Sequence, residues 1–167
     1  MNRKLMLVIA LVLVLVVTGV TVAMAAAQND LAQVRRATAR YHRTEVAQAA
    51  GYDLLPGLDH CFENPGVGAM GYHYINADLL DLELNADEPE AMVYAPGPNG
   101  QLKLAAVEYI VPAEPWDEAG TGDLPEVLGH HLHLNADLGV YVLHAWVWEN
   151  NPSGMFEDWN PRVICDS

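Results

Sequence analysis

Basic residues are scarce in this chain, which holds 8 Lys and Arg against 22 Asp and Glu and carries a formal net charge of −14. Beyond Arg43 only Lys103 and Arg162 are basic, whereas every acidic residue except Asp30 lies in that part of the sequence. A surface of this sign repels nucleic acid and anionic lipid, so neither is expected as a partner. The acidic balance suits solubility, a cationic ligand or a salty medium.

Several familiar catalytic patterns are absent as well. The chain contains no nucleophile-elbow serine, phosphate-binding loop, dinucleotide fingerprint or C-x-x-C pair. The tripeptide N-A-D occurs three times, but no twelve-residue calcium loop with a closing Glu accompanies it, so these are expected to be turns. No motif names a reaction for this protein.

Cysteine is limited to Cys61 and Cys165. In an oxidising compartment, a single pair most simply forms a disulfide. Such a bond would close a loop of about a hundred residues, and the lost chain entropy of the unfolded state would stabilise the fold by on the order of 4–5 kcal/mol. A copper-thiolate site is the competing interpretation, but it needs His and Met close after its cysteine, and only Asp166 and Ser167 follow Cys165. The sequence therefore predicts a Cys61–Cys165 disulfide.

The one long hydrophobic run lies at the start of the chain. Arg3 and Lys4 precede an apolar stretch over residues 5–17, and small residues at A-x-A spacing follow at 23–27. This layout predicts a signal peptide over residues 1–27. The uncharged stretch 5–27 also exceeds the ~20 residues that a bilayer needs, so an uncleaved anchor is the alternative, and only then is membrane attachment expected. Both interpretations place the protein outside the cytoplasm: extracellular, periplasmic or on the cell surface.

Residues 28–167 amount to about 140 residues, which is enough for a single secreted domain. Apolar positions at helical spacing predict a helix that starts at Asn29 or Asp30 and continues to Gly51. Residues rich in β-branched and aromatic side chains then predict strands over 70–75, 91–94, 102–111 and 140–148, with a turn at 96–100. The expected fold class is α+β, an N-terminal helix packed on an antiparallel sheet or small β-barrel.

Three polar residues stand in the middle of otherwise apolar strands: His73, Glu108 and His144. Desolvating such groups is costly unless a partner satisfies them, and a bound metal ion is one such partner. All three are predicted to face the interior and to converge there. His133 is the expected further ligand and His131 its substitute, because the two share a face if their segment is extended.

The residue types suit a divalent transition metal, since imidazole ligands favour Zn, Cu, Fe and Ni and a carboxylate shifts the preference towards Zn, Fe or Mn. Zn, Mn, Fe and Cu are therefore the candidate ions. The metal-free alternatives are a core His bonded to a carbonyl and an ion pair between Glu108 and a protonated His144. Four ligands scattered over about seventy positions form a weaker pattern than a compact motif such as H-E-x-x-H.

Five segments of the chain stand out: G-Y-H-Y (71–74), V-E-Y-I-V-P (107–112), L-H-A-W-V-W (143–148), N-P-S-G-M-F (151–156) and, before Cys165, W-N-P (159–161). With these segments the chain resembles a family of uncharacterised secreted bacterial proteins. The resemblance extends over most of the chain after residue 27. It implies a bacterial exported origin and adds weight to His73, Glu108 and His144, which lie inside these motifs. It implies no activity.

Three functions remain open from the sequence. The first is an exported metalloprotein, with an oxidoreductase, lyase or hydrolase activity among the options. The second is a metal-free module that binds a small molecule in a pocket lined by Tyr72, Tyr74 and Trp146. The third is a structural envelope domain held together by its disulfide. The expected partner is a metal ion or a small molecule.

Overall fold

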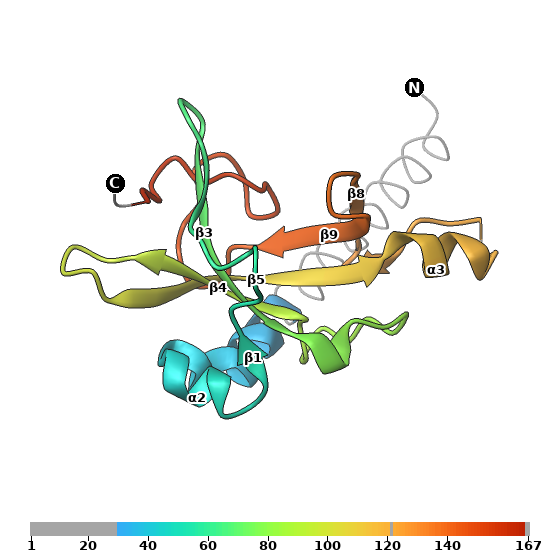
Figure 1. Cartoon of the computed structure of the whole chain (residues 1–167), viewed down its shortest axis with the longest axis horizontal. Coiled ribbons are helices and arrows are strands. Elements are labelled where there is room, and N and C mark those ends of the chain that lie inside the picture. Colours follow the sequence, from blue (N-terminus) through green and yellow to red (C-terminus); the bar gives the residue numbers. More distant parts are fainter. Residues whose placement is uncertain (1–29, 121, 166–167) are drawn as a thin grey trace, which may run out of the picture.

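A computed structural model describes residues 30–120 and 122–165. The predicted signal peptide lies outside the described residues. Figure 1 shows the N-terminal helical segment with α2 below a sheet, α3 at one end of it, and the C-terminal segment on the other side. None of the helices in the described ranges has the length and hydropathy of a membrane-spanning segment. The fold class is α+β, as the sequence predicted, and the sheet is open rather than closed into a barrel.

The sheet is antiparallel and has the strand order β1-β3-β4-β5-β9-β8, with β2 also paired to β3. A separate two-stranded sheet joins β6 to β7. The strands are β1 (Tyr52–Asp53), β2 (Phe62–Asn64), β3 (Gly68–Asn76), β4 (Ala91–Pro96), β5 (Leu102–Pro112), β6 (Glu126–Val127), β7 (His130–His131), β8 (His133–Asn135) and β9 (Val140–Ala145). The helical elements are 30–38, η1 (Ala39–His42), α2 (Thr44–Gln48), η2 (Ala77–Leu79) and α3 (Ala113–Glu118).

The predicted N-terminal helix is broken rather than continuous to Gly51. It narrows to the 3-10 turn η1 and stops at Arg43, whose backbone is extended, before α2 begins. Burial of Tyr41 explains the break: its carbonyl accepts a hydrogen bond of 2.6 Å from the Tyr94 hydroxyl, and its ring packs on Tyr52. The helical run is thus interrupted at Arg43, where the chain fixes Tyr41 against the sheet.

One face of the sheet packs against these helices. Val34, Tyr41 and Ala47 from the helical segments join the main core. Side chains from four strands complete this core: Tyr74, Met92, Tyr94, Val107, Tyr109, Val111, Tyr141, Leu143 and Ala145. Alternation of side chains along a strand leaves His73, Glu108 and His144 on the other face.

The opposite face carries two smaller apolar clusters. Ile75, Ala91, Ile110 and Val142 form one of them. The other lies under the C-terminal segment and contains Ala69, Val93, Ala95, Ala105, Ala106, Trp146 and Val163. The three polar residues lie on this face and are buried within it.

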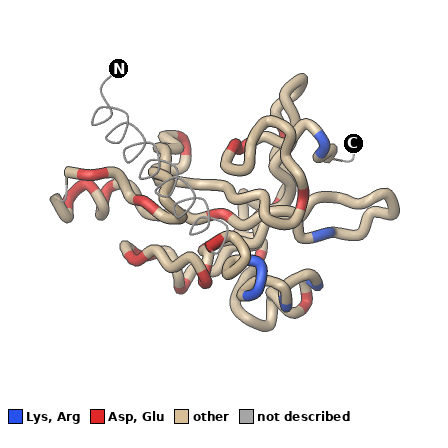
Figure 2. The backbone as a smooth tube through the Cα atoms, turned by 180° about the vertical axis from the view of Figure 1, so that it is seen from behind, with Lys and Arg blue, Asp and Glu red and all other residues tan. Residues whose placement is uncertain are grey.

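A disulfide joins Cys61 to Cys165, as the sequence predicted. It ties the C-terminal segment to the loop before β2 across a sequence separation of 104. Figure 2 shows that acidic residues are spread over much of the described chain, whereas the basic residues are few and gather mainly in the helical segment.

Candidate metal centre

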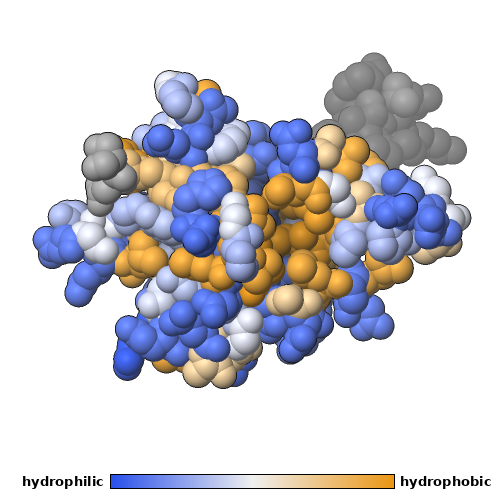
Figure 3. Space-filling view, viewed as in Figure 1, coloured by the Kyte–Doolittle hydropathy of each residue, from blue (hydrophilic) through white to orange (hydrophobic). Residues whose placement is uncertain are grey.

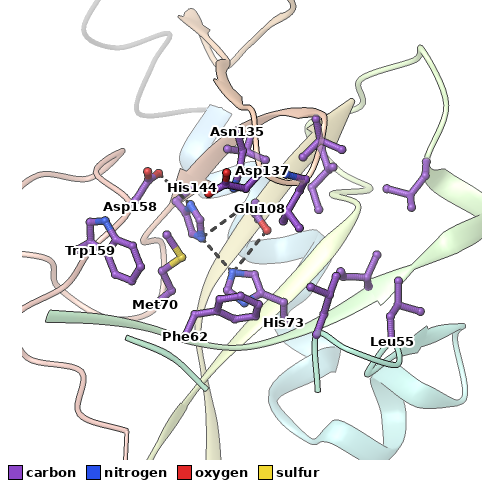
Figure 4. Close-up of a pocket in the computed structure, with 17 residues that line it drawn as sticks. Leu55, Phe62, Met70, His73, Glu108, Asn135, Asp137, His144, Asp158 and Trp159 are labelled. Carbon is purple, nitrogen blue, oxygen red and sulfur yellow. Dashed lines mark hydrogen bonds and ion pairs between the residues drawn. The ribbon is translucent and has the colours of Figure 1, made fainter. Parts of the chain in front are cut away.

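His73, Glu108 and His144 come from three different strands and meet on the face opposite the helices (Figure 4). Glu108 and His144 are directly paired residues of β5 and β9. His73 is on β3, and β4 lies between β3 and β5, so the side chains of His73 and Glu108 meet across the intervening strand. On β4, Val93 pairs with His73 and the small residue Ala91 pairs with Glu108.

The ligand atoms lie close together. Nε2 of His73 is 3.1 Å from Nε2 of His144. The Glu108 carboxylate approaches both rings, with Oε2 at 3.5 Å from His73 Nε2 and Oε1 at 3.6 Å from His144 Nε2. Each of the three residues offers one ligand atom, and these atoms all lie within 4.8 Å of one another. Such an arrangement could hold a metal ion. The sequence prediction that these residues converge is confirmed.

Burial is nearly complete at this site: His144 is 0% exposed, His73 5% and Glu108 7%. Burial and the neighbouring His144 ring lower the pKa of His73 to about 3, so this imidazole is neutral. Burial raises the pKa of Glu108, and the interaction with His144 opposes that rise only in part. Burial also acts to lower the pKa of His144, but Glu108 and Asp158 outweigh it, and the net shift is upward.

Asp158 belongs to no predicted site, yet it contacts His144 directly. Its Oδ1 lies 3.2 Å from Nδ1 of His144, and its Oδ2 lies 3.1 Å from Nε2 of His133. Burial acts to raise the pKa of this carboxyl, but the hydrogen bond with His144 prevails and lowers it, so Asp158 is ionised. Nothing in the local pattern distinguishes Asp158 from the many other acidic residues, and only the fold brings it to His144.

The C-terminal segment is held so that Asp158 has a defined place. The Asn151 side-chain amide donates to the carbonyls of Glu157 and Trp159, on either side of Asp158. The Trp146 indole also donates to the Glu157 carbonyl, at 2.6 Å. Two residues further on, Asn160 exchanges backbone hydrogen bonds with Ala69 of β3.

His133 and His131 take different positions from those expected. The strand is interrupted at Leu132: β7 ends at His131 and pairs with β6, whereas β8 begins at His133 and belongs to the main sheet. His133 lies on β8 with its side chain about half exposed, and it contacts Asp158 rather than joining the group of three. His131 lies on β7 and contacts Glu126 at 3.5 Å, and it is outside the group of three.

A cavity of about 420 Å³ opens beside the three residues, which form part of its wall. The hollow with apolar walls on this face of the molecule is visible in Figure 3. Tyr72, Tyr74 and Trp146 are not among its lining residues in the described chain. Tyr72 and Tyr74 point to the opposite face of β3, towards the main core, and Trp146 is buried under the C-terminal segment. Phe62 and Trp159 are the aromatic residues that line the cavity instead.

A local irregularity in β3 shapes this wall. Phe62 pairs with Gly71 while Glu63 pairs with Ala69, so Met70 is an extra, bulged residue, and it lines the cavity. Gly71 has a φ of 111°, and a Cβ there would collide with the Tyr94 carbonyl oxygen. Glycine is therefore required two residues before His73.

Comparison with protein-family models, with curated proteins and with solved structures found no match for this chain. The site therefore has to be interpreted from its own geometry.

Proposed function

We propose that this protein is an exported metalloprotein that holds one divalent transition-metal ion on His73, Glu108 and His144. The observation that carries the proposal is the approach of two buried imidazole nitrogens to 3.1 Å beside a buried carboxylate. Two nitrogens bound at about 2.0–2.1 Å from one ion, at angles between 90° and 109°, lie about 2.9–3.4 Å apart. The spacing of the two rings is within that range.

The hydrogen bond to Asp158 supports the same interpretation. A carboxylate that accepts from Nδ1 of a histidine fixes the ring tautomer and leaves the Nε2 lone pair free for a metal ion. Nε2 of His144 is the nitrogen that faces His73 and Glu108. Carboxylate–histidine–metal arrangements of this kind are the usual surroundings of metal-bound imidazoles.

The metal-free arrangement satisfies these groups less well. If His144 is neutral and donates its Nδ1–H to Asp158, His73 has to donate its own Nε2–H to His144, and Nδ1 of His73 is then a buried acceptor. Nδ1 of His73 completes no hydrogen bond with the described residues. A divalent ion accepts both Nε2 lone pairs and the carboxylate charge together. Nδ1 of His73 then carries the ring proton and can donate towards the backbone of Gly71. An interaction with that backbone already acts to raise the pKa of His73.

Two imidazoles and one carboxylate leave coordination positions open. Zinc hydrolases and mononuclear iron oxygenases both use two His and one carboxylate, so Zn and Fe head the candidate ions, with Mn and Cu after them. Open positions are characteristic of sites at which a ligand or substrate binds the ion. The proposed export rests on the disulfide, because such bonds persist in oxidising compartments, together with the signal peptide expected from the sequence.

The test is metal analysis of protein purified without added metal, followed by titration of the metal-free form with Zn²⁺, Mn²⁺, Cu²⁺ and anaerobic Fe²⁺. We expect one ion per chain and an increase in melting temperature on binding, because an ion that binds only the folded state stabilises it. His144→Ala and Glu108→Gln should each abolish high-affinity binding.

His131→Ala is the matched control, since it removes an imidazole that lies outside the group of three. It should keep the stoichiometry of one. Protein that is purified without metal and binds none of the four ions, while its circular dichroism shows it to be folded, would contradict the proposal.

A further inference from the structure

We propose that the cavity beside the metal centre binds a small, uncharged, largely aliphatic molecule that places a single oxygen or nitrogen donor on the ion. The inference rests on the proposed metal site for its donor part, whereas the apolar part rests on the cavity alone.

Most of the cavity wall is hydrocarbon. Eight aliphatic side chains line it: Leu55, Leu58, Ile75, Leu80, Ile110, Leu138, Val140 and Val142. Ile75, Ile110 and Val142 come from the same three strands as the metal-binding residues, each two positions from one of them. A volume of about 420 Å³ is within the range of small-molecule pockets, which are mostly apolar with a few placed polar groups.

The polar groups in the wall determine where a ligand's donor atom can go. His73, Glu108 and His144 are grouped together, with Phe62, Met70 and Trp159 around them (Figure 4). Leu55 lies at the far side of the cavity from Trp159 in the same view. A ligand that fills the cavity therefore has one polar end at the ion and an apolar body along the aliphatic wall.

The charges in the wall decide against an anionic ligand. Among the lining residues in the described part of the chain there is no Lys or Arg, and Asp137 and Asp158 contribute carboxylates besides Glu108. The two charges of a bound divalent ion face three carboxyl groups in the wall, and no cationic side chain adds to them, so an anion meets no excess of positive charge there. An uncharged donor such as a carbonyl, amide or hydroxyl needs no such excess.

Leu138 marks the mouth of the cavity, since it lines the wall and is 50% exposed to solvent. Leu134 provides a matched control on the same hairpin: it is 52% exposed and lies outside the cavity wall. Replacing either leucine by Asp adds the same charge at the same level of exposure. Only the change at Leu138 places a carboxylate at the entrance.

The experiment measures binding of three probes, hexanamide, acetamide and hexanoate, to Zn²⁺-loaded protein by calorimetry, and to Co²⁺-loaded protein by its visible absorption spectrum. We expect hexanamide to bind at least about tenfold more tightly than acetamide, because each buried CH₂ adds to affinity, and more tightly than hexanoate. Leu138→Asp should weaken hexanamide binding about tenfold and Leu134→Asp should leave it unchanged. A change in the Co²⁺ spectrum on binding places the donor on the ion.

The same titration of the metal-free protein separates the two proposals. If the chain holds no metal, weaker hexanamide binding that still depends on Leu138 supports the apolar cavity alone. If metal binds normally but hexanamide has no advantage over acetamide, or Leu138→Asp behaves like Leu134→Asp, the cavity proposal is overturned while the metal proposal stands. Tighter binding of hexanoate than hexanamide overturns the assignment to an uncharged ligand.

Discussion

Asp158 accepts a hydrogen bond from Nδ1 of His144 at 3.2 Å, although the two residues belong to different parts of the fold. His144 is next to the last residue of β9, and Asp158 is in the C-terminal segment that the disulfide and the Asn151 and Asn160 hydrogen bonds hold in place. Asp158 is thus a positioning residue: it orients the imidazole without being one of the three residues grouped at the proposed ion.

Asp158→Asn should weaken Zn²⁺ binding about 10- to 100-fold and keep the stoichiometry of one per chain, since changes to such outer partners of a metal-bound histidine have effects of this size. The measurement is competition with a chromophoric chelator. An unchanged affinity in a folded variant would show that Asp158 does not orient His144.

His133→Ala should have a smaller effect on Zn²⁺ affinity than Asp158→Asn, because His133 contacts Asp158 and is one hydrogen bond further from the proposed ion. The same chelator competition checks this, with His131→Ala as the control for loss of an exposed histidine. Complete loss of metal from His133→Ala would instead make His133 a direct ligand.

Removing the disulfide through Cys61→Ser with Cys165→Ser should lower the free energy of unfolding by about 2–5 kcal/mol, the typical loss for a native disulfide in a small secreted domain. The metal centre should also weaken, because Phe62, next to Cys61, packs edge-on against the His73 ring at 5.1 Å. Urea unfolding and Zn²⁺ titration measure the two effects. Thiol titration of the denatured, unreduced wild-type protein should detect no thiol.

Glu90→Gln should stabilise the protein at pH 8 and have little effect near pH 4. Glu90 is 1% exposed, and burial raises its pKa from 4.5 to about 8, so the folded state keeps the proton that the unfolded chain loses above pH 4.5. The native state binds more protons in this window, and stability therefore falls as the pH rises from about 4.5 to 8. Each pKa unit corresponds to about 1.4 kcal/mol, so the cost that Gln removes is a few kcal/mol.

Gln can still accept the hydrogen bond that Glu90 Oε2 receives from the Ile110 backbone N–H at 2.9 Å. The comparison requires urea unfolding of both proteins at pH 4, 6 and 8. A stability difference that stays constant across this range would show that Glu90 does not titrate as described.

The amino-acid pattern alone determined the fold class, the main strands and the identity of the three central polar residues. β-Branched and aromatic runs became β3, β4, β5 and β9, because such residues fit a pleated, buried surface wherever they pack. His73, Glu108 and His144 could be recognised because each interrupts an apolar strand, and a polar group there has to find a partner. Cys61 and Cys165 could be paired because there were only two cysteines.

Tertiary structure decided everything that depends on contacts between distant segments. The helix stops at Arg43 because Tyr94 from β4 takes the Tyr41 carbonyl, which no local pattern encodes. Asp158 reaches His144, and Trp159 lines the cavity, because hydrogen bonds hold the C-terminal segment against the sheet. Tyr72 and Tyr74 face away from the cavity because they alternate with His73 along β3. Residue spacing fixes which face a side chain occupies, whereas only the packed fold fixes its neighbours on that face.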